Sequence, residues 1–426
     1  MLGFRYTPAI ALGKLLRIGL KLRGGGSALP GFVTELFAPT LLSQVLEQLP
    51  RGVILVTGTN GKTTTTKILV ELLSAHGLTV ISNPTGSNFS RGIMSALLGS
   101  VDLRGRLSAD IAVLEIDEAH AVSFVRAVQP RVSLLLNVMR DQMDRYGEMD
   151  RTTQMLHSVA VATRDVLVLN VADPRLGSAG FLRDVTARVS GFGISDRLRH
   201  LYAIDDELTS DVDETLPEAV ASPATMLEEV GTTSVVSFGG RTHEFQLSLD
   251  GFYNQVNGVA AVAACRAILG ASFDPKRGLA ALPTIVPAFG RGEIFDVDGQ
   301  EVQLVLVKNP GGFRAVMASF EHSNVRTMIA LNDLDADGRD VSWIWDVDFS
   351  ALHDGVDVVT GTRAHDLWLR LNYDDVACEV VEPNPARAIR GFLTRNPGEP
   401  KRIYCTYTAM LALRRTLRLE ALGEVA

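Results

Sequence analysis

The sequence is poor in cysteine. Cys265, Cys378 and Cys405 are the only three in 426 residues, and no two of them form a CxxC pair. This spacing supports neither a zinc ribbon nor a disulfide framework, so we expect no bound zinc. A chain without paired cysteines is typical of a reducing compartment, and we expect a cytoplasmic protein.

Long apolar runs are also missing. Residues 1–26 are rich in leucine and isoleucine, but the runs are interrupted by Arg5, Lys14, Arg17, Lys21 and Arg23. They stop well before the roughly 18 apolar residues that a membrane span requires. The basic residues recur through the segment instead of preceding an apolar block, which argues against a secretory signal. A basic amphipathic helix remains; we expect it to dock on the protein body, with contact with a membrane surface as the alternative.

An excess of positive charge is absent too. The formal net charge is -8, which argues against a protein that binds nucleic acid by neutralising its phosphates. With 46% hydrophobic and 21% charged residues, the composition is that of a soluble globular protein. A chain of 426 residues has room for two or three domains.

Apolar runs alternate with helix-period stretches from residue 51 onward. This alternation predicts an α/β fold with a mainly parallel sheet covered by helices on both faces. A stretch rich in proline and glycine near residue 295 separates a second, smaller α/β unit. We therefore predict a basic helical segment at 1–45, a central domain at 46–294 and a C-terminal domain at 295–426. Nine acidic residues between 205 and 229, without an apolar period, predict an exposed excursion at about 203–230.

In the segment VSWIWDVDF, residues 341–349, every second residue is apolar, and Ser342, Ile344, Asp346 and Asp348 stand between them. A period of two predicts a strand whose buried face carries Val341, Trp343, Trp345, Val347 and Phe349. Asp346 and Asp348 would then lie side by side on the opposite face. A solvated or edge-protecting charge is the simple explanation for such carboxylates, and contact with another protein is the alternative.

The stretch VTGTNGKTTTTKILVELL, residues 56–73, has the pattern of a phosphate-binding loop between a strand and a helix. Glycines in the loop allow backbone N–H groups to face an anion, and the following helix adds the partial positive charge of its N-terminus. Lys62 can reach the outer phosphates, and the Thr63 hydroxyl can ligate Mg²⁺. We predict that ATP is bound by Gly58, Thr59, Asn60, Gly61, Lys62, Thr63 and Thr64.

Residues 57–64, TGTNGKTT, resemble the phosphate loop of the Mur ligase superfamily, which includes folylpolyglutamate synthetase. Enzymes of this superfamily phosphorylate a carboxylate with ATP and let an amine displace the phosphate. The resemblance implies that Lys62 is catalytic and that Glu115, in LEIDEAH, holds Mg²⁺ together with Thr63. A solvated carboxylate at the end of a strand is the alternative for Glu115.

Three further ATP contacts follow from this resemblance. Asn254 and Asn257, in GFYNQVNG, correspond to residues that contact adenine, although they could simply cap a helix. Arg291, in FGRGE, corresponds to an arginine near the nucleotide phosphates. Gln142 stands where the superfamily usually has a metal-proximal histidine, so a metal ligand is not expected there. Asp141, Asp144 and Arg145 are polar candidates near the reaction centre, or else belong to the first turn of a surface helix.

The C-terminal sequences VKNPGGF, DADGRDVSWIWDVDF and YCTYTAMLALR resemble the MurT family within the superfamily. Its members are the ATP-dependent subunits of lipid II isoglutaminyl synthase, which amidates the α-carboxylate of D-glutamate in the lipid II stem peptide. Ammonia comes from a glutaminase subunit, GatD. The resemblance therefore implies ATP and Mg²⁺, lipid II as substrate and a GatD-like partner. The phosphate loop begins at residue 57, which leaves no room for the UDP-binding domain of most Mur ligases.

The same resemblance implies a role for the aspartates of residues 341–349. In this family an aspartate of the WIWD segment is thought to complete the Cys–His site of the glutaminase, and Asp346 is the best match, with Asp348 second. A carboxylate bonded to a catalytic histidine fixes its tautomer and stabilises its protonated form. No cysteine of this chain lies in a nucleophile-elbow context, so the ammonia source is expected on a partner.

Two other functions stay open on the sequence. An amino-acid ligase similar to folylpolyglutamate synthetase would act without a partner, although LVKNP at residues 306–310 departs from that pattern. A non-catalytic scaffold subunit would bind nucleotide without amidating anything.

Overall fold

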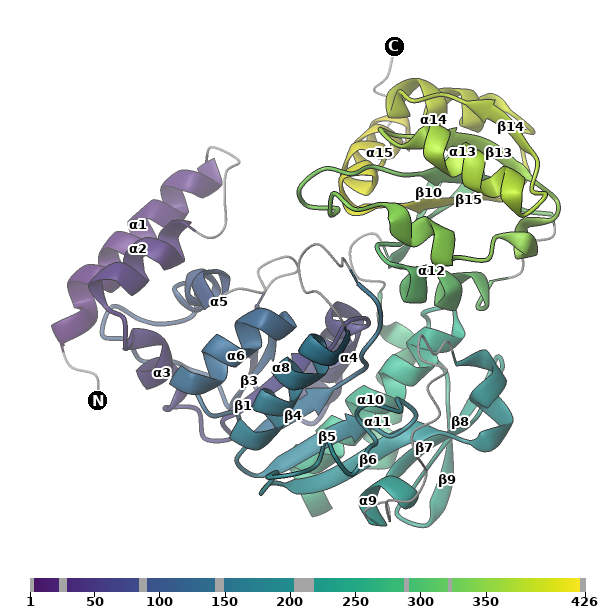
Figure 1. The fold of residues 1–426 in the computed structure, drawn as a ribbon. Coiled ribbons are helices and arrows are strands. Elements are labelled where there is room, and N and C mark those ends of the chain that lie inside the picture. The colour runs from purple at the N-terminus through teal and green to yellow at the C-terminus, as the bar shows by residue number, and fades with distance from the viewer. Residues whose placement is uncertain are drawn as a thin grey trace.

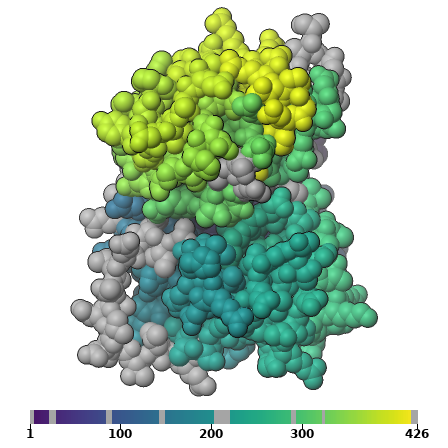
Figure 2. All heavy atoms as spheres, turned by 90° about the vertical axis from the view of Figure 1, so that its right-hand side faces the viewer, coloured from purple at the N-terminus to yellow at the C-terminus, as the bar shows by residue number. Residues whose placement is uncertain are grey.

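The computed structural model describes residues 4–22, 29–83, 90–141, 149–202, 218–286, 291–320 and 324–421. They form two β-sheets with packed helices and a helical N-terminal segment (Figure 1). The predicted α/β class is confirmed. The second sheet and its helices, green to yellow, sit on the central part of the molecule (Figure 2).

The first sheet has nine strands in the order β2-β3-β1-β4-β5-β6-β7-β8-β9. All pairings from β2 through β7 are parallel, and β8 and β9 add an antiparallel hairpin. The strands are β1 Val53–Thr57, β2 Val80–Ser82, β3 Ile111–Glu115, β4 Val132–Leu135, β5 Val166–Asn170, β6 Arg188–Ile194, β7 Thr225–Glu229, β8 Ser234–Phe238 and β9 Arg241–Phe245.

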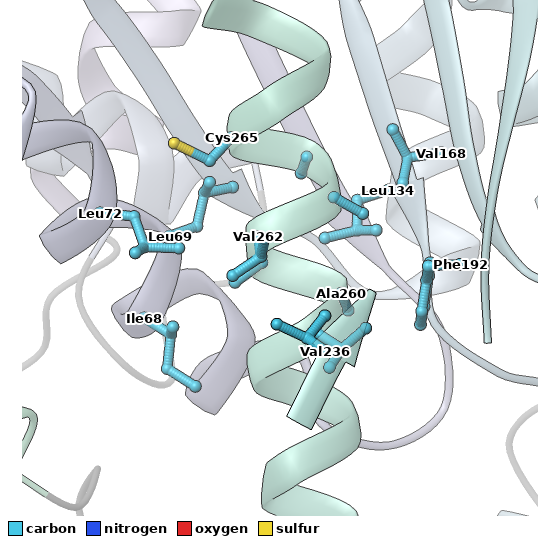
Figure 3. Close-up of a cluster of buried hydrophobic side chains, with 14 of the residues drawn as sticks. Ile68, Leu69, Leu72, Leu134, Val168, Phe192, Val236, Ala260, Val262 and Cys265 are labelled. Carbon is cyan, nitrogen blue, oxygen red and sulfur yellow. The ribbon is translucent and has the colours of Figure 1, made fainter. Parts of the chain in front are cut away.

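Both faces of this sheet are covered, which explains why its central strands are apolar throughout. Alternate residues of β1 enter different cores: Ile54 and Val56 face one cluster, Val53 and Leu55 the other. The first core is closed by α4 (Lys62–Ala75) and α10 (Phe252–Leu269), with Leu69 and Val262 side by side (Figure 3). The second is closed by α3 (Leu41–Leu46), α5 (Ser90–Leu97), α6 (Glu118–Ala127) and α8 (Met149–Ala162).

The second sheet has six strands in the order β10-β11-β15-β12-β13-β14, with only the β10–β11 pair antiparallel among the described pairings. Its strands are β10 Arg291–Val297, β11 Gln300–Leu306, β12 Arg326–Ala330, β13 Val356–Thr360, β14 Cys378–Val381 and β15 Lys401–Cys405. Its helices are α12 Pro310–Met317, α13 Ala364–Tyr373, α14 Pro385–Thr394 and α15 Tyr407–Ala421.

The predicted strand at residues 341–349 is wrong. Residues Ser342–Asp346 form a short 3-10 helix, and Trp345 is 48% exposed instead of buried. Because β12 and β13 are adjacent and parallel, the chain between them must cross back over the sheet and cannot join it. The carbonyl groups of Ile344 and Val347 accept hydrogen bonds from Arg370 in place of a strand ladder.

The predicted acidic excursion is wrong for its second half; residues 203–217 lie outside the described residues. Glu218–Ala221 form helix α9, and Thr225–Glu229 form β7, which pairs with β6 and β8. Leu227 is fully buried in the first core. Strand β7 lies next to the β8–β9 hairpin and has few buried apolar residues. The acidic residues around it therefore left no recognisable alternation in the sequence.

Helices α1 (Thr7–Leu22) and α2 (Leu29–Phe37) lie side by side and extend away from the first sheet (Figure 1). α2 packs against α5, which fixes the pair to the central part of the molecule. In the described part of the chain, no helix combines the length and apolarity needed to cross a membrane.

Candidate active site

The predicted phosphate loop connects β1 to α4, as the sequence indicates. Gly58 and Gly61 have φ angles of 129° and 86°, a region that favours glycine. A Cβ at Gly61 would overlap the side chain of Asn257 from α10, so this glycine is required for packing as well. α4 begins at Lys62, and the unpaired N–H groups of its first turn adjoin the loop. This is the geometry of an anion site.

Lys62 is buried at the centre of the loop. Its Nζ atom donates to Gly58 O at 2.6 Å and lies 3.1 Å from Asp117 Oδ1 and 3.3 Å from Glu118 Oε2. Burial acts to lower the pKa of Lys62, but the charges of Glu118, Asp117, Asp141 and Glu115 outweigh it and raise the pKa. Burial likewise acts to raise the pKa of Asp117, and Lys62 holds it below the usual value. The Lys62 ammonium group therefore stays protonated at neutral pH.

Thr63, in the first turn of α4, meets Glu115, at the carboxyl end of β3. The Thr63 hydroxyl donates to Glu115 Oε1 at 2.7 Å, and both residues are buried. Asn83 holds the backbone of Glu115 with two hydrogen bonds of 2.9 Å each. Within the described ranges, no three His, Cys, Asp or Glu side chains cluster as a metal site. A hydroxyl and one carboxylate are nevertheless suited to Mg²⁺, which takes its other ligands from phosphates and water.

Replacing Glu115 by glutamine is expected to raise the Mg²⁺ concentration needed for half-maximal ATP turnover at least tenfold. Loss of a partner of a metal ligand typically costs about 10- to 100-fold in metal affinity, and loss of a direct oxygen ligand should cost no less. Titration of turnover with Mg²⁺ measures the effect. Glu71→Gln, at an exposed position of α4, is the matched control. An unchanged Mg²⁺ requirement in Glu115→Gln would remove Glu115 from the metal site.

The loop is also braced by the end of β4. The Asn137 carbonyl accepts from Thr59 N at 3.0 Å, and its side-chain oxygen accepts from Asn60 N at 2.8 Å. Asn137 Nδ2 returns a bond of 3.1 Å to Asn60 O. One side chain therefore fixes both peptide groups that precede Gly61.

A polar bridge joins the phosphate loop to the C-terminal sheet. Asp141 accepts from Lys308 Nζ at 3.0 Å and from Asn309 Nδ2 at 3.2 Å. Asn309 also donates to Asn60 Oδ1 at 3.1 Å and caps α12. Burial acts to raise the pKa of Asp141, but Lys308 and Lys62 hold it below the usual range. The carboxylate stays charged and ties α12 to the loop.

Replacing Lys308 by methionine is expected to lower turnover about tenfold, since a misplacement of about 1 Å in an active site can cost as much as 10²-fold. Asp141 would be left without its closest cation, and α12 would lose one of its links to the loop. Steady-state kinetics measure the effect, and small-angle scattering should show a larger radius of gyration. Arg395→Met, which breaks an exposed ion pair with Glu379, is the control. Equal turnover in both variants would contradict a role for the bridge.

Asp346 lies beside the same bridge. Its Oδ2 atom is 2.9 Å from Arg140 Nη1, and the two side chains are 43% and 46% exposed. An ion pair this exposed contributes about 0–1 kcal/mol, so a partner's side chain can replace Arg140 at small cost. The neighbouring Trp345 stacks edge-on with Tyr373, which is also exposed, at 5.1 Å between ring centroids.

Asp348 has a different partner from Asp346. Its Oδ1 atom accepts from Ser350 N at 2.9 Å, and hydrogen bonds from Ser350 lower its pKa. The two aspartates are therefore not equivalent: Asp348 caps a local turn, whereas Asp346 reaches toward the central part of the molecule.

The remaining predicted residues are placed as follows. Asn254 is buried in the first turn of α10, where its Nδ2 donates to Asp250 O at 2.6 Å and its Oδ1 has no partner among the described residues. Asn257 lies against Gly61, which puts it at the phosphate loop. Arg291 begins β10, but its side chain lies outside the described residues. Gln142, Asp144 and Arg145 lie outside them too.

Comparison with known proteins decides the family. Residues 56–265 match the model of the Mur ligase middle domain, and residues 306–410 match that of the MurT ligase C-terminal domain. A lipid II isoglutaminyl synthase subunit MurT from Streptococcus pneumoniae is 29% identical over 98% of each chain. The chain belongs to the MurT family. A MurT subunit from Staphylococcus aureus is 28% identical and covers 88% of this chain and 90% of its own.

Solved structures support the same fold for this MurT-family chain. MurF ligase from Thermotoga maritima in complex with ADP has a TM-score of 0.68 at 16% identity, covering 91% of this chain and 85% of its own. FolC from E. coli, in complex with DHPP and ADP, has a TM-score of 0.63 at 17% identity, covering 89% and 92%.

Sequence reasoning missed several side chains of this MurT-family site. Asp117 binds Lys62, Asn83 and Asn137 brace Glu115 and the loop, and Arg140 pairs with Asp346. Asp117 lies two residues after Glu115, and Arg140 directly precedes Asp141. Their closeness to these predicted site residues could have marked them as candidates. The side chains of Asn83 and Asn137 bind the main chain of Glu115 and of Asn60, which are distant in sequence, and no local pattern shows such contacts.

Proposed function

We propose that this chain is the ATP-dependent subunit of a lipid II isoglutaminyl synthase. It activates the α-carboxylate of D-glutamate in the lipid II stem peptide, and ammonia from a GatD-like glutaminase converts it to D-isoglutamine. The observation that carries this proposal is the match to MurT subunits over nearly the whole chain, together with the intact Lys62 and Thr63–Glu115 arrangement.

The reaction has two transfers. A carboxylate oxygen of the substrate attacks the γ-phosphorus of ATP, the bond to the bridging oxygen breaks, and ADP leaves. Ammonia then attacks the carbonyl carbon of the acyl phosphate, the C–O bond to phosphate breaks, and one proton is lost from nitrogen. The products are the amide, ADP and inorganic phosphate.

The residues present suit this chemistry. Lys62 places a fixed charge where negative charge develops on the transferred phosphoryl group, and the N–H groups of Gly61 and of the first turn of α4 add to it. Thr63 and Glu115 would hold Mg²⁺, which neutralises phosphate charge when bound. Asn254 and Asn257 would contact the nucleotide, and Arg291 its phosphates.

The surface around Asp346 supports the proposed partner. Trp345 and Tyr373 are exposed aromatic residues of the kind enriched in protein interfaces, and Asp346 projects beside them. Asp346 would accept a hydrogen bond from the catalytic histidine of the glutaminase, in place of Arg140. The ammonia would then be released near the bridge at Asp141, a short way from Lys62. We place this reaction in the cytoplasm, at the inner face of the membrane that holds lipid II.

Two other functions predict different results. An amino-acid ligase would increase the mass of the acceptor by an amino-acid residue, and a scaffold subunit would leave it unchanged. The test supplies the purified chain with ATP, Mg²⁺, ammonium and lipid II, without a partner. We expect lipid II to lose about 1 Da as one carboxyl becomes a carboxamide, with one ADP formed per amide. Unmodified lipid II from a folded, ATP-binding protein would favour the scaffold.

A further inference from the structure

Helix α1 is apolar on its exposed side as well as on its packed side. Its packed side carries Ala9, Ile10 and Gly13, whereas Leu12 and Leu15 are exposed. Leu15 is 68% exposed, and Ile18 extends the exposed apolar side by another turn. A surface helix normally covers its apolar side chains, and in the described part of the chain this second apolar side of α1 is left exposed.

Helix α2 repeats the arrangement. It packs on its neighbours through Gly31 and Thr34, and exposes Leu29, Leu36 and Phe37. A Cβ at Gly31 would overlap the backbone of Arg91 on α5, so this close approach depends on the missing side chain. Seven of the 18 large apolar side chains exposed in the described part of the chain belong to these two helices. We call the exposed apolar side chains of these two packed helices the α1–α2 surface: Leu12, Leu15, Ile18, Leu29, Phe32, Leu36 and Phe37.

The charge of this region is opposite to that of the whole protein. Residues 4–37 contain five basic residues and one acidic residue, Glu35, in a chain of net charge -8. Glu35 is itself 3.7 Å from Arg91, whose guanidinium lies 4.3 Å above the ring of Phe32. Among the described side chains Arg5 is exposed and Lys14 and Arg17 are partly exposed, so positive charge lies in the same region as the exposed apolar side chains. Another copy of this chain would bring the same positive charge, which disfavours self-association through this surface.

We infer that the α1–α2 surface docks on an anionic lipid bilayer. Exposed leucine and phenylalanine enter the interface between headgroups and acyl chains, and the basic residues contact the phosphates. The two helices would lie in the plane of the membrane, and the acidic remainder of the protein would be repelled from it. This inference rests on the proposed function and deepens it, because it provides the means by which the enzyme reaches a lipid-linked substrate.

The test measures binding of the full chain to vesicles that contain no lipid II. Vesicles of phosphatidylglycerol and phosphatidylcholine are compared with pure phosphatidylcholine by sedimentation. We expect binding to the anionic vesicles that weakens with salt. The double variant Leu15→Glu/Leu36→Glu should bind at least about tenfold more weakly, because two exposed apolar side chains that would enter the bilayer become charged. Leu103→Glu/Leu411→Glu adds the same charge at exposed leucines elsewhere and should bind like the wild type.

Three results would overturn the inference. The wild type could fail to bind anionic vesicles, both double variants could lose binding equally, or Leu15→Glu/Leu36→Glu could dissociate a dimer in gel filtration while vesicle binding stays unchanged. Thermal unfolding of both variants checks that they fold. Amidation of detergent-solubilised lipid II separates this inference from the proposed function: activity without vesicle binding defeats only the membrane surface, and vesicle binding without activity defeats only the ligase.

Discussion

Replacing Lys62 by methionine is expected to lower ATP-dependent amidation by about 10²- to 10³-fold, the loss typical when one donor to a charged transition state is removed. Methionine keeps the unbranched chain as far as the ε position and removes the charge that lies 3.1 Å from Asp117. The effect should fall on kcat, because the charge acts on the phosphoryl group during transfer. Initial rates with ammonium as nitrogen donor measure it without involving the glutaminase.

The control for this variant is Lys67→Met, one turn further along the same helix and only half-buried. Lys62→Met leaves the largely buried carboxylates of Asp117 and Glu118 without their cation, which can destabilise the fold. The thermal unfolding of this variant is therefore measured together with its rate. A folded Lys62→Met protein with nearly normal kcat would show that phosphoryl transfer does not depend on this lysine.

Replacing Asp346 by asparagine is expected to lower glutamine-dependent amidation about 10³- to 10⁴-fold and to leave ammonium-driven amidation unchanged. Loss of the carboxylate that orients a catalytic histidine has an effect of about 10⁴ in a catalytic triad. The variant should fold normally, because Asp346 is half-exposed and its ion pair with Arg140 adds little stability. Glutamine hydrolysis by the reconstituted pair and ammonium-driven amidation by the same sample provide the two rates.

Asp348→Asn discriminates between the two aspartates. Its carboxylate is engaged by Ser350, so we expect the glutamine-dependent rate to stay within about twofold of wild type, as for a surface substitution away from a site. A large loss in Asp348→Asn with a normal Asp346→Asn would move the assignment to Asp348. Loss of both glutamine- and ammonium-driven activity in a folded Asp346→Asn protein would reject the role in the partner's site.

The fold class could be predicted because its signals are local. Strand β1, the glycines at 58 and 61 and the start of α4 follow one another within a few residues, and the structure keeps that order. The hairpin at Gly239 and Gly240 was also predictable, since both residues have positive φ angles that glycine favours. The pairing of Thr63 with Glu115 needed the family resemblance, because Thr63 begins helix α4 after β1, whereas Glu115 ends the neighbouring strand β3, 52 positions further along the chain.

The failures have a common physical cause. Residues 341–349 fit a strand period except at Ile344, but the neighbouring strands β12 and β13 already pair with each other, so tertiary structure overrides the local preference. The bridge from Asp141 to Lys308 joins residues 167 positions apart, and no spacing rule connects them. The sequence predicted one basic amphipathic helix where the structure has α1 and α2, and it did not predict that their apolar side chains are exposed. A sequence shows which side of a helix is apolar but not which side is covered.

The central claim is that this chain activates lipid II for amidation by nitrogen from glutamine. The most direct measurement incubates the chain and its glutaminase partner with lipid II, ATP, Mg²⁺ and glutamine labelled with ¹⁵N at the side-chain amide, followed by fragmentation mass spectrometry of the stem peptide. We expect the label in the α-carboxamide of the D-glutamate residue, with one ADP formed for each labelled amide. Lipid II that gains an amino-acid residue, or that remains unlabelled while ATP is hydrolysed, would contradict the claim.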